Sequence, residues 1–324
     1  MAAPRFQRYE TAVAADAAGG GLPEFRRLTS GDIMEVNRIL TGPFRPLSRT
    51  CDYSIGGIFM WTDYFDYTFS VFSDTLFIKG VTENNITDAA FSLPAGALPL
   101  KESVELLRRY CADHDGLQLK FSAVPADRID ELRSLGATLV EPLDDWADYL
   151  YSASSLATLA GKKMSKKRNH VNRFMADNPD YRLEPLGDHN IAEVLAFLDS
   201  KPTMLTKPVL ADVERMQTRR VLENLKLYPM MEGAVLRTAV KGPVAAFAVG
   251  EVIGDTLYEH IEKIDHEISG AGETICHLFA AMMTARHPEI MYVNREEDTG
   301  DPGLRYAKES LHPLEKIRKF NVVM

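Results

Sequence analysis

Hydrophobic positions change their spacing repeatedly along this chain, which indicates helices and strands mixed along its length. Apolar residues three and four apart predict helices over residues 30–40, 101–114 and 189–198. Positions that alternate between apolar and polar predict a β-hairpin that turns at Ser73-Asp74. Helices and strands that follow one another in this way are typical of an α/β fold with mixed sheets.

The second half of the chain contains three consecutive strands, expected over residues 234–240, 244–252 and 256–264. The third strand carries polar side chains that point to both of its faces, which is unusual inside a domain. Strict alternation places Tyr258, His260 and Glu262 on one face, and Glu259, Ile261 and Lys263 on the other. We therefore treat Glu262, His260 and Lys263 as site candidates, although a histidine in such a position is more often a core residue than a catalyst.

A densely charged stretch lies where a strand is expected to end and a helix to begin. Residues 290–293 form an apolar run, and Asp301 and Pro302 are a favourable N-cap and first helical position. Charged side chains crowd the segment between them and the first helical turns: Arg295, Glu296, Asp298, Arg305 and Lys308. Such charges are costly beside a buried strand end unless they pair or meet a ligand, and strand ends in open α/β sheets commonly bind ligands. The local pattern favours a ligand site and a self-contained ion-pair cluster equally.

Residues 161–174 contain six cationic side chains and no acidic one. At helical spacing, Met164, Val171 and Phe174 fall on one apolar stripe. The opposite face carries Lys162, Lys166, Asn169 and Arg173, while Lys167 and Arg168 flank the stripe. Like charges at this spacing repel each other, so we expect an anionic partner, and phosphate is the obvious one. The alternative is a solvated face whose charges pair with acidic residues elsewhere.

A short glycine loop precedes the next expected helix, whose apolar face begins at Ile275. Gly270 and Gly272 lie in this loop, directly after the polar strand at 256–264. Free backbone N–H groups at the start of a helix form a natural anion site. We therefore expect the two glycines to help bind a phosphate group, although a Gly-x-Gly pair also occurs where only a turn requires it.

Length, charge and cysteine content narrow the class of protein. At 324 residues the chain exceeds one small domain, and we expect a disordered tail over residues 1–24 followed by domains at 25–150 and 151–324. A net charge of −9 argues against a general nucleic-acid coat, and no apolar run is long enough to span a bilayer, so no integral membrane contact is expected. Three scattered cysteines suit reduced thiols in a cytoplasmic protein without a metal site. The sequence leaves the oligomeric state open.

An acidic patch around Trp146 lies near the expected boundary between the two domains. Asp144, Asp145 and Asp148 form it, and we interpret it as a solvated linker. Nothing in the pattern of the first domain indicates catalytic residues, so we expect the active site in the second.

Several of these motifs occur together in one known family. The order hairpin, charged strand, glycine loop, helix, strand and helix resembles the acyltransferases of the GNAT superfamily, with Glu267 at the first position of their glycine-loop motif. KKRNH at 166–170, HIEK at 260–263, VNREEDTGDPGLR at 293–305 and KESLHP at 308–313 resemble the phosphatidylglycerol lysyltransferase C-terminal-domain family in its short soluble form. The aromatic stretch at residues 53–67 is similar to the first half of that family. The resemblance implies two GNAT-like domains in tandem.

The resemblance also implies a reaction class. Membrane-bound relatives in that family move an amino acid from aminoacyl-tRNA onto a lipid, as the Fem transferases do onto peptidoglycan precursors. By this hypothesis the chain is an acyl- or aminoacyltransferase without a covalently bound cofactor. Its donor carries phosphate and is either aminoacyl-tRNA or an acyl-coenzyme A thioester, and its acceptor is an amine or a hydroxyl.

Acyl transfer needs a general base, stabilisation of an oxyanion and a grip on the donor's phosphates. We assign Glu262 or Asp298 as the base or as a carboxylate that orients the acceptor, and Arg295, Arg305 and Lys308 as the groups that stabilise charge. Donor binding is assigned to Gly270, Gly272, Lys166, Lys167, Arg168 and Asn169. The alternative function is a non-enzymatic module that binds tRNA or another phosphorylated ligand, with residues 295–298 purely structural.

Overall fold

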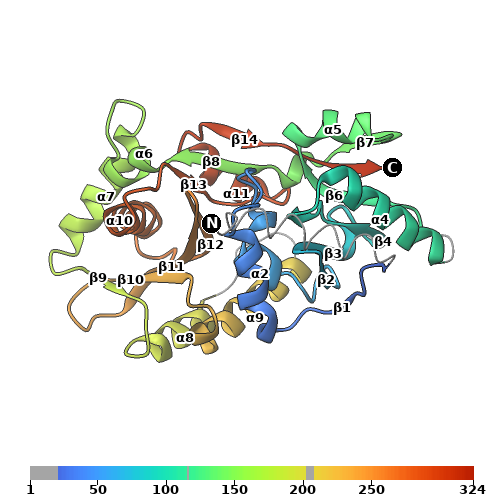
Figure 1. Cartoon of the computed structure of the whole chain (residues 1–324). Coiled ribbons are helices and arrows are strands. Elements are labelled where there is room, and N and C mark those ends of the chain that lie inside the picture. Colours follow the sequence, from blue (N-terminus) through green and yellow to red (C-terminus); the bar gives the residue numbers. More distant parts are fainter. Residues whose placement is uncertain (1–20, 115–116, 202–207) are drawn as a thin grey trace, which may run out of the picture. The chain divides into compact units, whose positions relative to one another are not determined.

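The computed structural model of the chain describes residues 21–114, 117–201 and 208–324 (Figure 1). Residues 1–20 of the expected tail therefore lie outside the described residues. The chain forms two compact units. The second unit comprises Arg49–Met60 and Ala147–Ile317, and the first holds the rest of the described chain.

The first unit is built on a mixed sheet of eight strands. In spatial order these are β1 (Arg26–Arg27), β2 (Thr68–Phe72), β3 (Thr75–Thr82), β4 (Asn85–Phe91), β6 (Lys120–Pro125), β15 (Lys319–Val323) and β7 (Leu139–Pro142), with β5 (Ala95–Gly96) beside β3. Its helices are α2 (Ile33–Leu40), α4 (Leu100–Asp113) and α5 (Ile129–Ser134), with 3-10 turns at Ser30–Asp32, Ala126–Arg128 and Asp144–Trp146. The expected hairpin is confirmed as β2 and β3, and Ser73 and Asp74 both have the positive φ that its tight turn requires.

The two units differ from the expected division at residues 150/151. Strand β15 is the last in the sequence but pairs with β6 and β7 of the first unit, where Val322 is fully buried. Arg49–Met60 comes from the first half of the chain but belongs to the second unit. Strand β8 (Asp148–Ser152) lies across the expected boundary. Hydrophobic spacing predicts a strand but does not report which sheet the strand joins.

The second unit is built on a sheet of seven strands. In spatial order these are β14 (Glu315–Ile317), β8, β13 (Tyr292–Asn294), β12 (Thr256–Ile264), β11 (Val244–Ile253), β10 (Met231–Arg237) and β9 (Arg182–Pro185). Its helices are α3 (Ile55–Phe59), α6 (Ala153–Thr158), α7 (Ser165–Asp177), α8 (Ile191–Ser200), α9 (Pro208–Glu223), α10 (Ala271–Arg286) and α11 (Pro302–Glu309), with 3-10 turns at Cys51–Tyr53 and Leu225–Leu227. Strands β12 and β13 pair in parallel, and their other neighbours pair antiparallel. None of the described helices is both long and apolar enough to cross a bilayer.

Helices α6, α7 and α10 cover one face of this sheet, which we call the α10 face (Figure 1). Phe279 of α10 is fully buried there and shares one hydrophobic core with the sheet. The expected apolar stripe along the basic segment is confirmed, because Met164, Val171 and Phe174 are buried in the same core. The cationic residues of α7 therefore lie on the sides of the helix that do not face the sheet.

The segment Arg49–Met60 and helix α8 pack against the opposite face, which we call the α3 face. Phe197 of α8 meets Phe247 of β11 in an edge-on contact with the ring centroids 6.0 Å apart. Cys51 forms a small buried cluster with Ile253 and Tyr258. The seven-stranded sheet is thus buried on both faces, so polar side chains that point from it must find partners.

An irregularity in the ladder between β11 and β12 changes which side chains of β12 share a face. The ladder pairs Val249 with Ile261 and Gly250 with Glu259. His260 is thus an extra residue, as in a β-bulge. The bulge brings the carboxyl groups of Glu259 and Glu262 to the same face, where both contact Arg295. The prediction that Glu262 shares a face with His260, opposite to Glu259, is therefore wrong.

Candidate functional site

The candidate site lies where two parallel strands of the second sheet separate. The ladder between β12 and β13 ends at the pair Tyr258 and Asn294, while β12 continues to Ile264. The carboxyl ends of neighbouring parallel strands are the usual place for ligands in α/β sheets. Charged residues follow the end of the ladder on both strands. Some of their side chains point to the α10 face and others point to the α3 face.

Arg295 joins the two strands beyond the end of this ladder, on the α10 face. Its guanidinium lies 2.9 Å from Oε1 of Glu259 and 2.7 Å from Oε2 of Glu262. The side chain of Glu259 is 2% exposed, that of Arg295 11% and that of Glu262 21%. Glu262 is therefore the acid through which solvent or a substrate reaches this group. We call these three residues the Arg295 cluster.

The Arg295 cluster holds two carboxyl groups for one guanidinium. Burial raises the pKa of Glu259 to about 8, because Arg295 offsets only part of the cost of desolvation and Glu262 adds repulsion. Oε2 of Glu259 is buried and has no hydrogen-bond partner among the described residues. Glu259 therefore holds a proton more tightly than an exposed glutamate does.

Three neighbouring elements supply further titratable groups on or near the Arg295 cluster. Cys276 of α10 and Tyr151 of β8 are buried there, and burial raises the pKa of both, so both stay protonated. The positive charge of Lys167 on α7 also acts on Cys276, and its Nζ lies 3.2 Å from Oε1 of Glu273. The cluster thus sits between the sheet and the N-terminal part of α10.

The residues after Arg295 fold into a turn that is fixed by three of the predicted site residues. Arg305 holds Asp298 with two hydrogen bonds of 2.9 and 2.7 Å, and the hydroxyl of Tyr149 donates to Asp298 at 2.6 Å. Nζ of Lys308 donates to the backbone carbonyls of Arg295 and Glu297, both at 2.5 Å. Asp298, Arg305 and Lys308 are therefore bound to the protein itself.

The start of α10 is the place where the sequence predicts an anion site. Gly270 is its N-cap with φ +79°, and a Cβ on it would lie 2.5 Å from the carbonyl oxygen of His170. The glycine thus allows α7 to pack directly against the loop. The carboxylate of Glu273 lies 3.0 Å from Nδ1 of His170 and is also bound by Lys167 and by its own backbone N–H, which together lower its pKa against the effect of burial. The positive end of the helix is therefore already occupied by an acid of the chain.

Helix α7 divides the predicted donor-binding residues into two groups. Lys167 is held by Glu273, and Nη1 of Arg168 donates to the carbonyl oxygens of Leu159 and Gly161. These two cations fix α7 in place. The exposed polar residues of the segment are Lys162, Lys163, Lys166, Asn169, His170, Asn172 and Arg173. This exposed group, which we call the basic face, remains open to solvent, although Arg173 also lies 3.5 Å from Asp177.

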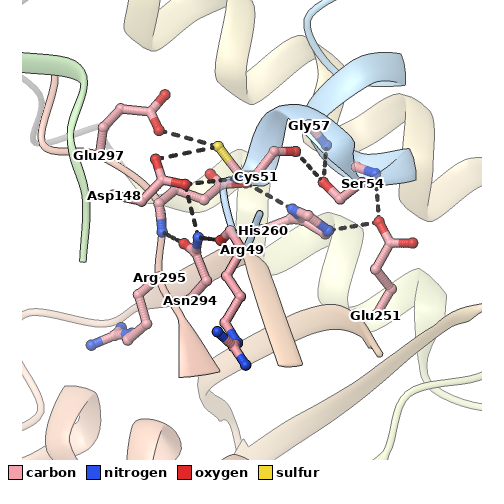
Figure 2. Close-up of polar contacts among 12 residues, drawn as sticks. Arg49, Cys51, Ser54, Gly57, Asp148, Glu251, His260, Asn294, Arg295 and Glu297 are labelled. Atoms are coloured by element: carbon pink, nitrogen blue, oxygen red, sulfur yellow. Dashed lines mark hydrogen bonds and ion pairs between the residues drawn. The ribbon is translucent and has the colours of Figure 1, made fainter. Parts of the chain in front are cut away.

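Figure 2 shows a second buried cluster, on the α3 face of the sheet. Nδ1 of His260 lies 2.7 Å from Oε1 of Glu296, and its Nε2 lies 2.9 Å from Oε1 of Glu251. Burial alone would lower the pKa of this imidazole, but the two carboxylates raise it to about 10. His260 is therefore an imidazolium at neutral pH and donates from both ring nitrogens. Glu251 also accepts the N–H of Gly56 at 2.7 Å, which ties α3 to the sheet.

Asp148 is at the centre of a further set of polar contacts in Figure 2. Its Oδ2 accepts from the N–H of Cys51 at 2.7 Å and from Nδ2 of Asn294 at 2.8 Å. Sγ of Cys51 lies 3.4 Å from Oε2 of Glu297. The thiol and one oxygen from each acid lie within 4.8 Å of one another, so Cys51, Asp148 and Glu297 could hold a metal ion.

Comparison with known families adds to this geometry. The profile of the family described as "Phosphatidylglycerol lysyltransferase, C-terminal" matches residues 44–323. The chain belongs to this family. The resemblance inferred from the sequence motifs is thus confirmed, and so is the fold class of two GNAT-like α/β domains in tandem. A search of curated proteins finds no match to the chain.

Three solved structures are informative neighbours of this member of the lysyltransferase family. A conserved protein of unknown function from Bacteroides thetaiotaomicron is 29% identical, with a TM-score of 0.81 over 94% of this chain and 100% of that one. L-PGS from Bacillus licheniformis is 15% identical, with a TM-score of 0.54 over 80% of this chain and 84% of that one. FemX is 12% identical, with a TM-score of 0.53 over 93% and 97%. The last two likenesses concern the fold.

The structure brings only some of the predicted residues of this family member together. Glu262 and Arg295 are in contact at the separation of β12 and β13, whereas Asp298, Arg305 and Lys308 brace the turn that follows. Gly270 and Gly272 lie at the start of α10, and Lys166, Lys167, Arg168 and Asn169 lie on α7.

Two acids of the site were missed by reasoning from the sequence. Glu259 was placed on the wrong face because the bulge at His260 leaves no mark in the alternation of residue types. Asp148 is fully buried, so the interpretation of the acidic patch as a solvated linker is wrong there, while Asp144 and Asp145 are exposed as expected. The apolar and aromatic residues directly after Asp148 were the available indication of a buried strand.

Proposed function

We propose that this chain is an aminoacyltransferase, which moves an aminoacyl group from aminoacyl-tRNA to an amine or hydroxyl acceptor. The observation that carries the proposal is the arrangement at the start of α10, where a helix end already filled by Glu273 lies beside the basic face of α7. Membership of a lysyltransferase family and a fold shared with FemX support the reaction class.

The start of α10 favours aminoacyl-tRNA over a coenzyme A thioester as the donor. A pyrophosphate seated on the N–H groups of α10 would compete with the carboxylate of Glu273 for the same positive helix end. A nucleic-acid backbone instead contacts several separate cations at once. Lys162, Lys163 and Lys166 are exposed and spaced along one segment, as such a backbone requires.

The Arg295 cluster supplies the chemistry in this proposal. Glu262, its most exposed acid, accepts the proton of the attacking amine or hydroxyl. The guanidinium of Arg295 stabilises the negative charge that develops on the carbonyl oxygen of the aminoacyl ester. Asp298, Arg305 and Lys308 act by holding the turn that positions Arg295, because their polar atoms are bound to the protein.

Replacing Lys162, Lys163, Lys166 and Arg173 together with glutamine is expected to weaken binding of aminoacyl-tRNA and to flatten its dependence on salt. Each phosphate contact that is lost reduces the slope of log K against log salt by roughly 0.7 to 0.9. Fluorescence anisotropy with labelled tRNA over a series of salt concentrations measures both quantities. A coenzyme A thioester in the same assay is expected to bind weakly to both proteins.

A charge-matched control separates a local site from general attraction. The control replaces four exposed cations elsewhere, Lys101, Arg109, Arg133 and Lys241, with glutamine. It is expected to bind tRNA nearly as well as the wild type. Equal losses in the two variants would mean that only net charge matters, and tight binding of the thioester would reverse the choice of donor.

Glu262→Gln is expected to lower kcat for aminoacyl transfer by about 10²–10⁴-fold while tRNA binding stays close to that of the wild type. Glutamine keeps the size of the side chain but cannot accept the proton. Transfer of a radiolabelled amino acid from tRNA to a panel of amines and hydroxyl compounds measures the rate. Glu184→Gln is the matched control, because Glu184 shares Arg237 with Glu193 as Glu262 shares Arg295 with Glu259. Full activity in Glu262→Gln would show that Glu262 is not the general base.

The pairing of the charges after β13 also favours a second candidate, a tRNA-binding module without catalysis. Arg295, Asp298 and Lys308 all have partners within the chain, as a purely structural ion-pair network would. Specific binding of aminoacyl-tRNA without transfer to any acceptor in the panel would support this candidate over the enzyme.

A further inference from the structure

Glu259 is a buried acid that shares one nitrogen atom with the acid assigned as the base. Nη2 of Arg295 lies 2.9 Å from Oε1 of Glu259 and 2.7 Å from Oε2 of Glu262. The bulge at His260 is what makes this possible, because it turns both side chains to the α10 face. Two carboxylates that meet at one nitrogen repel each other, and a proton on one of them relieves the repulsion.

The hydrogen bonds of the pair are incomplete without such a proton. Oε2 of Glu259 and Oε2 of Glu262 are both buried and lack a hydrogen-bond partner among the described residues. The contact of Glu262 with Arg295 is an ion pair whose geometry is not that of a hydrogen bond. A carboxylic acid can donate a hydrogen bond where a carboxylate cannot, so one proton turns two unpaired acceptors into a donor and an acceptor.

The described groups around the pair leave its charge unbalanced. Among the described residues, Arg295, which follows β13, contributes the cation in direct contact. Cys276 of α10 and Tyr151 of β8 are neutral, and Lys167 of α7 is bound to Glu273. Two carboxylates against one guanidinium carry a net negative charge in a buried place. One proton makes the cluster neutral.

We propose, on the basis of the aminoacyl transfer proposed above, that Glu259 and Glu262 hold one proton between them and that Glu259 is the positioning residue that keeps Glu262 ready as the proton acceptor. The acceptor's N–H or O–H gives its proton to Glu262 as its lone pair forms the bond to the acyl carbon. The C–O bond to the tRNA ribose then breaks, and the pair returns a proton to the departing oxygen. The pair begins and ends the cycle with one proton.

The shared proton also explains how one buried arginine can stabilise the resting cluster and then the transition state. At rest its charge is offset by the singly protonated pair, so the neutral cluster is stable in a buried place. When Glu262 takes the acceptor's proton, the pair loses its negative charge and the guanidinium becomes uncompensated. This happens in the same step in which the carbonyl oxygen becomes negative, so the positive charge appears when the transition state needs it.

Infrared spectroscopy of the full-length protein tests the shared proton without a donor or an acceptor. A carbonyl band of a protonated carboxyl group is expected in the wild type at neutral pH and is expected to disappear in mildly alkaline buffer. The band should be absent in Glu259→Gln and retained in Glu184→Gln. It should also be lost in Glu262→Gln, because Arg295 then has a single carboxylate to balance. A wild type without the band, or a band unchanged in Glu262→Gln, overturns the proposal.

The pH profile of transfer separates a positioning role from a purely structural one. Wild-type kcat/KM is expected to fall on the alkaline side as the shared proton is lost. Glu259→Gln should lower kcat/KM on the order of tenfold and lose this alkaline step, and Glu259→Asp should restore the step. An active wild type whose pH profile is unmoved in Glu259→Gln overturns this inference alone. A wild type that transfers nothing overturns the proposed function, and this role with it.

Discussion

Replacing Arg295 with methionine is expected to lower the free energy of unfolding by about 3–5 kcal/mol at neutral pH. Methionine fills much of the same volume but leaves Glu259 and Glu262 without their cation. An uncompensated charge in a buried place costs more than the ion pair contributed, so the loss exceeds that of an exposed pair. Urea unfolding followed by circular dichroism measures it.

The deficit of the Arg295→Met variant is expected to grow as the pH rises through 8, and the direction follows from Glu259. Its pKa in the folded wild type is about 8, raised from 4.5, so the folded state binds its proton more tightly than the unfolded state does. Such a group contributes its full stability below pH 4.5 and loses it as the pH rises towards 8. Without Arg295 the folded-state pKa rises further, so the variant continues to lose stability above pH 8, where the free energy of unfolding of the wild type levels off.

Arg237→Met is the matched control for this prediction. Arg237 is also buried and also holds two acids, Glu184 and Glu193, but both of these are more exposed than Glu259. Water can therefore solvate them when the arginine is removed, and a smaller deficit with less dependence on pH is expected. Equal deficits that do not change with pH in the two variants would show that Glu259 and Glu262 do not form a buried, charge-sensitive pair.

Local sequence patterns predicted several elements of the fold but not how distant segments join. The spacing of Ile33, Val36 and Leu40 identified α2, because a helix buries one face wherever it packs. The alternation that predicted β2 and β3 is likewise a property of neighbouring residues. The assignment of Arg49–Met60 to the second unit and of β15 to the first sheet depends on pairing with distant strands. Pairing between distant strands produces no periodic pattern of residue types in the sequence.

In the candidate site, too, local sequence patterns identified some residues but did not predict the contacts between distant residues. Glu262 and Arg295 were found because charged residues are rare on buried strands, and this rarity is visible in the sequence. Their pairing with Glu259 required the bulge at His260, which is fixed by hydrogen bonds to Glu251 and Glu296 on the other face. Functional geometry at this place therefore depends on a departure from regular structure.

Replacing Gly56 with alanine is expected to lower the free energy of unfolding by about 3 kcal/mol, at the upper end of the cost of overpacking. The added Cβ would lie 2.5 Å from Nε2 of His260 and in steric conflict with two ring carbons. The ring cannot move aside, because Glu251 and Glu296 hold its two nitrogens at 2.9 and 2.7 Å. Alanine favours a helix over glycine by about 1 kcal/mol, so helix propensity alone predicts the opposite sign.

A double-mutant cycle with His260→Ala identifies the cause of the loss in Gly56→Ala. Removing the imidazole leaves room for the Cβ, so Gly56→Ala should cost about 1 kcal/mol or less in that background, and the two substitutions should be strongly coupled. Gly272→Ala is the control, because its Cβ would meet only the end of the flexible Ile264 side chain, at 3.1 Å. It should leave stability unchanged or slightly raised. An undiminished cost in the His260→Ala background would show that α3 does not rest on the imidazolium, and the link between the bulge and this helix would fail.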